Sequence, residues 1–137
     1  MSKAEEAVRL HGMGCNCCQA VVCAFADETG MDKAVLYKLG EGFGAGMGTG
    51  LGVCGALSGA VMLAGICNSD GDTEHPAHTK AATMKIAAGM QRDFSEKAKR
   101  IICREIKTGD GGKAFTSCDD CIRIAAEIAE KTLNLSF

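Results

Sequence analysis

Residues 42–65 read GFGAGMGTGLGVCGALSGAVMLAG, and this uncharged stretch governs how the chain folds. Residues 42–52 alternate glycine with other residues, a pattern that does not support a stable helix. Residues 53–67 continue as an apolar run and predict a helix. A helix of that length falls short of the roughly 30 Å of a membrane's hydrocarbon core. We therefore expect a buried core helix and no membrane insertion.

Apolar residues at helical spacing predict helices on both sides of this stretch. Ser2 and Ser117 are each followed three residues later by an acid, which indicates capping boxes at two helix starts. No segment shows the alternation typical of a strand. We expect one all-α domain over residues 1–137, a single compact helical domain of five to seven helices with a glycine-rich loop. The flanking helices are expected at residues 2–10, 16–28, 32–39, 79–98, 101–106 and 117–133.

Length and charge narrow the range of partners. The chain has 137 residues and a formal net charge of −2 at pH 7, so no positive excess attracts nucleic acid or an acidic membrane. The opening residues, MSKAEEAVRL, contain two acids and no apolar run. We therefore expect no signal peptide and a cytoplasmic location.

Cysteine is the residue type that points most directly to a function. The chain contains nine cysteines, an odd number and far more than ordinary usage. In the reducing cytoplasm structural disulfides are rare. Cysteines in such number are therefore more typical of redox centres, metal sites or clusters than of disulfide bridges.

Several cysteines fall at predicted helix starts. Cys54 begins the helix that follows the glycine-rich loop, Cys17 and Cys18 follow a break at Gly14, and Cys118 and Cys121 follow Ser117. Free backbone N–H groups and the helix dipole favour negative charge at such positions by about 0.3–1 kcal/mol. A thiolate is stabilised there, and the thiolate is the form that attacks disulfides or binds metal. The same N–H groups can donate to the sulfides of an iron–sulfur cluster.

Cys103 has a different setting. It lies beside Arg104 and four residues after Lys99. Nearby positive charge lowers the pKa of a thiol, so we expect a lowered pKa at Cys103.

The remaining cysteines point less clearly to function. Cys23 and Cys67 lie within apolar helical stretches, and buried free cysteine is common, so we expect both in the core. Cys15 and Cys18 are compatible with either a structural or a functional role, and with Cys118 they could extend a ligand set.

Four segments, taken together and in this order, resemble the C_GCAxxG_C_C family of redox-active proteins. GCNCCQAVVCAF (14–25) resembles its "G-x-N-C-A-Q-A-V" helix start, and residues 42–59 resemble its glycine-rich loop followed by CGAxxG. ICREI (102–106) resembles its "C-R-E-L" element, and CIRIAAEIAEK (121–131) its terminal helix. The cysteines that match the family positions are Cys17, Cys54, Cys103 and Cys121.

The resemblance implies a redox role for these four cysteines, and it supplies no substrate. The chain departs from the family pattern by placing Cys18 where alanine is usual. It also adds cysteines outside the four family positions. The ligand set is therefore either the four family cysteines or an enlarged one. The added cysteines are Cys15, Cys23, Cys67 and Cys118.

The first hypothesis for the function is an iron–sulfur protein for electron transfer. Four thiolates complete the coordination of a [4Fe-4S] or [2Fe-2S] cluster, and we expect Cys17, Cys54, Cys103 and Cys121 to hold it. Such a chain acts either as an oxidoreductase or as an electron carrier for a redox partner protein. The small-residue helix faces also favour a homodimer.

Two alternatives remain open. The first is a dithiol–disulfide protein without metal, with Cys17/Cys54 and Cys103/Cys121 as expected pairs. Cys118 and Cys121 also form a CxxC, but the two aspartates between them should oppose a thiolate. The second alternative is a structural zinc module that uses Cys15, Cys17 and the CxxC pair as close ligand pairs.

Overall fold

The structure is a computed structural model and describes residues 1–134. Helices form most of this part of the chain. This part contains no β-strand, only isolated bridges between Val53 and Ile102 and between Asp110 and Lys113. The all-α prediction is therefore confirmed. The helices are α1 (Lys3–Gly12), α2 (Cys17–Ala24), α3 (Ala26–Thr29), α4 (Lys33–Gly40), α5 (Gly44–Met47), α6 (Gly55–Asn68), α7 (Lys80–Ala98), α8 (Cys103–Thr108) and α9 (Cys118–Thr132), with the 3₁₀ helix η1 (Glu41–Phe43).

The helices outnumber the five to seven that the sequence predicted. The helix expected over residues 16–28 divides into α2 and α3 because the backbone at Phe25 turns to φ −105° and ψ 15°. The glycine-rich loop also contains the short turns η1 and α5. Apolar spacing does not reveal such breaks, since Phe25 is buried in the core like its neighbours.

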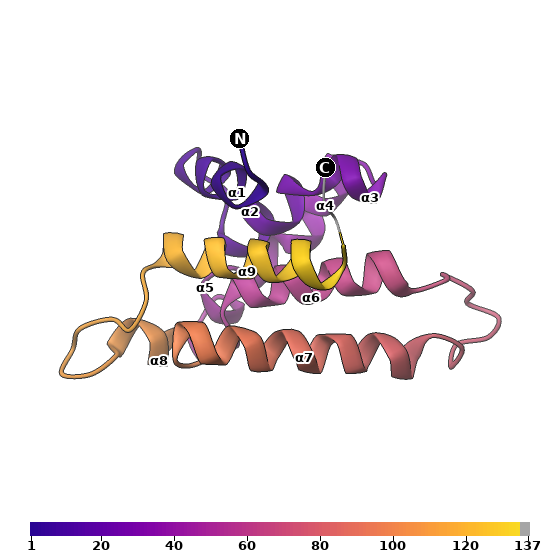
Figure 1. Cartoon of the computed structure of the whole chain (residues 1–137). Coiled ribbons are helices and arrows are strands. Elements are labelled where there is room, and N and C mark those ends of the chain that lie inside the picture. The colour runs from indigo at the N-terminus through magenta and orange to yellow at the C-terminus, as the bar shows by residue number, and fades with distance from the viewer. Residues whose placement is uncertain (135–137) are drawn as a thin grey trace.

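The helices pack in three levels (Figure 1). Helices α6 and α9 lie side by side in the middle, α1 and α2 cover them on one side, and the long α7 covers them on the other. Helix α8 lies beyond the end of α7, near α5. The starts of α2, α6, α8 and α9 are thereby gathered at the same end of the molecule.

Small residues on α6 allow α2 to approach closely. A Cβ atom on Gly59 would lie 3.0 Å from the Cβ of Val21 and 3.1 Å from the carbonyl oxygen of Cys18. A Cβ on Gly55 would lie 3.3 Å from the Cβ of Cys17. Glycine at these two positions therefore brings the start of α2 against the start of α6.

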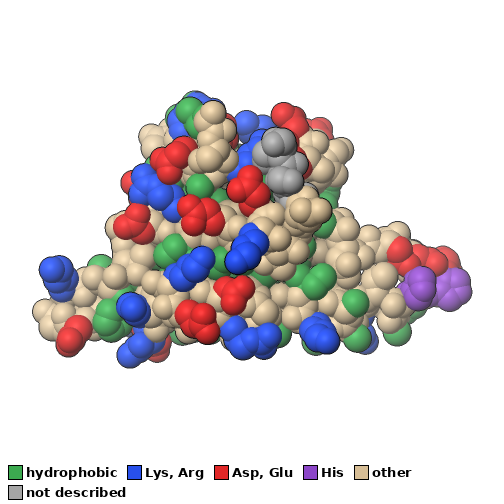
Figure 2. Space-filling model, in the orientation of Figure 1, with side chains coloured by type: hydrophobic (Ala, Val, Ile, Leu, Met, Phe, Trp, Pro, Cys, Tyr) green, Lys and Arg blue, Asp and Glu red, His purple; other side chains and the backbone are tan. Residues whose placement is uncertain are grey.

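The surface carries both signs of charge. Acidic and basic side chains are interleaved over the face shown in Figure 2. His75 and His78 are exposed on the loop between α6 and α7, where they pair with Asp72 and Asp70. Within residues 1–134, no helix has both the length and the apolar character needed to cross a membrane.

Candidate functional site

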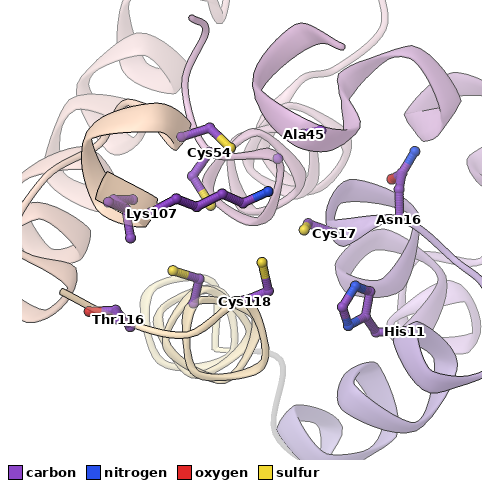
Figure 3. Close-up of a pocket in the computed structure, with 12 residues that line it drawn as sticks. His11, Asn16, Cys17, Ala45, Cys54, Lys107, Thr116 and Cys118 are labelled. Carbon is purple, nitrogen blue, oxygen red and sulfur yellow. The ribbon is translucent and has the colours of Figure 1, made fainter. Parts of the chain in front are cut away.

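One cavity brings together thiols from four different helices. Its volume is about 190 Å³, and five of the nine cysteines lie on its wall (Figure 3). The four cysteines that match the family positions are all among them, and Cys118 is the fifth. The lining residues are His11, Asn16, Cys17, Ala45, Cys54, Gly55, Cys103, Ile106, Lys107, Thr116, Cys118 and Cys121.

Local capping signals place three of these cysteines. Asn16 caps α2 through a reciprocal capping box with Gln19, so Cys17 is the first residue of that helix. The Ser117 hydroxyl accepts a hydrogen bond from the backbone N–H of Asp120 at 3.1 Å, and α9 therefore begins at Cys118. Cys121 follows one turn later on the same side of the helix.

A short backbone bridge places the other two cysteines side by side. The N–H of Cys54 donates to the carbonyl of Ile101 at 2.7 Å, and the N–H of Cys103 donates to that of Gly52 at 3.0 Å. These bonds join the start of α6 to the start of α8, which is 49 positions later in the chain. The join explains why Cys54 and Cys103 line the same cavity.

The glycine-rich loop packs tightly against these two backbone hydrogen bonds. Gly46 has a φ of +63°, and a Cβ there would lie 2.5 Å from the Cβ of Cys103 and 2.8 Å from the Gly52 carbonyl oxygen. A Cβ on Gly44 would lie 2.5 Å from the side chain of Asn16. These glycines therefore let the loop lie against both Cys103 and the start of α2.

Cys54 and Cys121 form the first thiol pair. A hydrogen bond with the Cys121 thiol lowers the pKa of Cys54 to about 7, against the effect of burial. The backbone amides of Ala56 and Leu57 also lower the pKa of Cys54. The same bond, together with burial, raises the pKa of Cys121. One thiolate and one thiol therefore share this pair near neutral pH.

Cys118 and Cys17 form the second pair. A hydrogen bond with the Cys17 thiol lowers the pKa of Cys118 to about 6, and Lys107 and His11 contribute in the same direction. That bond, followed by burial, raises the pKa of Cys17. The expected opposition from a neighbouring aspartate to a Cys118 thiolate is present, but it does not decide the outcome. Asp119 does raise the pKa, but the hydrogen bond and the positive charges outweigh it.

Cys103 also departs from its expected state. Burial raises the pKa of Cys103, and the positive charge of Lys107 opposes this effect. The expected influence of Arg104 and Lys99 is absent. Proximity in sequence does not bring a charge near the sulfur, because the thiol of the first α8 residue faces the cavity while Arg104 is exposed.

The other four cysteines do not line this cavity. Cys18 is fully buried and contacts the sulfur of Met62 at 3.4 Å, and burial raises its pKa to about 12. Cys15 packs against the core. Cys23 is buried, as expected. Cys67 is exposed at the end of α6, so the prediction that it lies in the core is wrong; the last turn of α6 extends past the end of α9 (Figure 1).

Polar residues on the cavity wall, among them His11, Asn16 and Lys107, were not predicted as part of the site. His11 contacts the carboxylate of Asp119 at 3.0 Å, which ties the end of α1 to the start of α9. Asn16 was foreseen as a helix start, but its amide also donates to the Glu41 carbonyl at 2.9 Å and holds the glycine-rich loop. Lys107 reaches from α8 over the cavity (Figure 3). The capping box around Asn16 was readable in the sequence, whereas nothing local identifies His11 or Lys107.

The chemistry available at this site is that of sulfur in two protonation states. Two thiolates at neutral pH, each paired with a thiol, are nucleophiles and soft metal ligands. Within the described residues, no group of three or more His, Cys, Asp or Glu side chains is arranged to hold a metal ion.

Comparison with protein families gives one match. The family model described as "Putative redox-active protein (C_GCAxxG_C_C)" matches residues 15–133, which is most of the chain. The matched segment contains all five cysteines of the cavity. No curated protein and no solved structure matches the chain.

Proposed function

Because the chain belongs to the C_GCAxxG_C_C family of redox-active proteins, we propose that its cysteine cavity holds an iron–sulfur cluster that transfers electrons to and from a partner protein. The observation that carries the proposal is the gathering of Cys17, Cys54, Cys103 and Cys121 on one cavity wall, from four helices that are distant in sequence. Packing alone does not require five sulfurs to share one cavity.

The donor set suits a cluster better than a single ion. Zinc in a structural site takes four ligands at about 2.0–2.3 Å, which draws the sulfurs tightly together. A cluster distributes its cysteine ligands over two or more iron atoms, so its ligand sulfurs lie farther apart. Thiols that come from four helices and lie around one cavity therefore suit a cluster, whose ligands need not share one metal ion.

Four cysteines would hold the cluster, and the surrounding residues would tune it. When bound, the cluster supplies one-electron transfer at a potential that depends on hydrogen bonds, charge and solvent exposure. The backbone amides of Ala56 and Leu57 favour negative charge on the Cys54 sulfur. Lys107 places a positive charge over the cavity, which offsets negative charge on the sulfurs. Low exposure of Cys54 and Cys103 limits the access of water.

The first experiment is quantification of iron and acid-labile sulfide in protein purified without oxygen. We expect a brown protein with an absorbance between the near-UV and the visible. Cys54→Ser should lose the cluster, whereas Cys23→Ser, which changes a buried cysteine outside the cavity, should retain it. Full iron and sulfide content in the Cys54→Ser variant would contradict the proposed ligand set.

A second function is favoured by the two hydrogen-bonded pairs. In a dithiol–disulfide reaction, the Cys118 thiolate attacks a sulfur of a partner's disulfide and forms a mixed disulfide. Cys17 then loses its proton and displaces the partner's second thiol. Two electrons and the Cys17 proton pass to the partner, which takes its second proton from solvent and becomes a dithiol, and a Cys17–Cys118 disulfide remains. The contacts support Cys17 with Cys118, and Cys54 with Cys121, rather than the pairs expected from the sequence.

Colour and thiol content separate the two functions. A dithiol protein purified without oxygen is colourless and contains no iron, and mild oxidation should link Cys17 to Cys118 in peptide mapping. Zinc found by metal analysis in place of iron would support the structural zinc module. The homodimer and the cytoplasmic location stay predictions.

A further inference from the structure

A second cavity adjoins the cysteine cavity at α8. Its volume is about 380 Å³, and Ala45, Cys103 and Lys107 lie on the walls of both cavities. The rest of its wall comes from the glycine-rich loop and from α8. These residues are Gly48, Thr49, Gly50, Arg104 and Thr108.

The charge in this second cavity is entirely positive. Arg104 and Lys107 are its only charged lining residues, and no carboxylate lies on its wall. Among the described residues, neither of these two cations forms an ion pair with a carboxylate. The Arg104 guanidinium makes one long hydrogen bond, to the Thr49 carbonyl at 3.4 Å, so most of its five N–H groups are available to a ligand. The concentration of two cations in one cavity favours an anion.

Backbone contacts hold the cavity in shape. The N–H of Arg104 donates to the Gly50 carbonyl at 2.8 Å, and this bond ties α8 to the glycine-rich loop. Gly48 and Gly50 have φ values of +78° and +83°, which favour glycine, and the absence of side chains there leaves the cavity open. Both walls are therefore formed before any ligand arrives, which reduces the entropy cost of binding.

We propose that this second cavity binds the phosphate or carboxylate group of a small anionic molecule. A guanidinium matches the two oxygens of such a group with parallel N–H donors, and Lys107 adds a point charge. The Thr108 hydroxyl lies on the same wall and offers a further donor. The ligand would lie next to Cys103, at the edge of the redox site. Anion binding goes beyond the proposed function and does not depend on which sulfur chemistry operates there.

Titration calorimetry with inorganic phosphate, at constant ionic strength, tests the proposal. We expect saturable binding at one site, weakened about tenfold or more in Arg104→Gln and in Lys107→Gln. Lys97→Gln removes the same charge from an exposed position on α7, outside the cavity, and should bind phosphate like the unaltered chain. Acetate in a parallel titration distinguishes a carboxylate site from a phosphate site.

Amide chemical shifts locate the bound ion. Phosphate should move the ¹H–¹⁵N signals of Gly48, Thr49 and Gly50 in the unaltered chain. The proposal is overturned if neither anion saturates, if the shifts scatter over the surface, or if Lys97→Gln weakens binding as much as Arg104→Gln. Cys54→Ser should keep its phosphate binding, and Arg104→Gln should keep its iron and sulfide. Failure of the anion site is thereby distinguishable from failure of the iron–sulfur proposal.

Discussion

At the scale of single residues, the thiols of the site act as pairs of unlike protonation state. Burial alone would raise every cysteine pKa, as it does at Cys18. At Cys54 and Cys118 a hydrogen bond from a neighbouring thiol reverses that effect and lowers the pKa to about 7 and about 6. The pairing therefore sets which sulfurs are nucleophilic at neutral pH, more than any charged neighbour does.

The pH dependence of alkylation tests this pairing in metal-free, reduced protein. Cys118 should react with iodoacetamide with a midpoint near pH 6, since the thiolate is the reactive form. Cys17→Ala removes the hydrogen bond that favours the thiolate, so the pKa of Cys118 should rise toward 9.0. The alkylation rate of Cys118 at pH 7 should then fall about tenfold.

Fragment-ion mass spectrometry measures alkylation at Cys118 separately from Cys121. Cys23→Ala is the matched control, because Cys23 is buried away from the cavity, and its pH profile should equal that of the unaltered chain. An unshifted midpoint in Cys17→Ala would show that Cys17 does not control the ionisation of Cys118.

At the scale of elements, the glycine-rich loop leads into α6 and contacts the starts of α2 and α8. Gly44 lies against Asn16 before α2, Gly46 lies against Cys103 in α8, and Gly52 accepts the N–H of Cys103. The alternating glycines thus serve close backbone approach rather than phosphate binding of the dinucleotide type. No strand precedes the loop in the described chain, as such a motif would require.

Alanine substitutions at two glycines of the same loop distinguish the cost of backbone strain from the cost of a steric clash. Gly46→Ala should lower the free energy of unfolding by about 3 kcal/mol, because a left-handed φ adds to a clash with Cys103 and Gly52. Gly48→Ala has a similar φ of +78° but nothing within 4 Å of its Cβ, so it should cost only about 1 kcal/mol. Urea denaturation of the metal-free protein measures both values. Equal losses would mean that the contact at Gly46 relaxes without cost.

At the scale of the whole molecule, the candidate site lies where the starts of four helices meet. Its five cysteines belong to the starts of α2, α6, α8 and α9, which span residues 17 to 121. Any group that binds all of these sulfurs at once binds only the folded chain. Its binding free energy therefore adds to the stability of the fold.

Removal of iron provides the corresponding test under the iron–sulfur proposal. Chelation without oxygen should lower the Tm of the unaltered chain by about 5 °C or more. The Tm of Cys23→Ser should fall by a similar amount on chelation, because its cluster site is intact. Cys54→Ser should melt at the same temperature before and after chelation, since it holds no cluster to remove. A protein that contains stoichiometric iron and sulfide but keeps its Tm on chelation would contradict this linkage.

Helix positions and the placement of cysteines at helix starts were predictable from the sequence because their causes are local. Asn16 and Ser117 cap the helices that begin at Cys17 and Cys118, and the apolar run after residue 53 forms α6. Capping and helical periodicity act within a few residues. The resemblance to the family likewise depends on short motifs, and the family match over residues 15–133 confirms it.

The partner of each thiol and the charge near it arise from contacts between helices distant in the chain. Cys17 pairs with Cys118 rather than with Cys54. The positive charge that lowers the pKa of Cys103 comes from Lys107 rather than from Lys99. Cys67 is exposed at the end of α6. Each of these outcomes depends on which helices pack together and at what offset. The packing of helices depends on many weak contacts between residues that are distant in the chain. A short window of sequence therefore does not predict it.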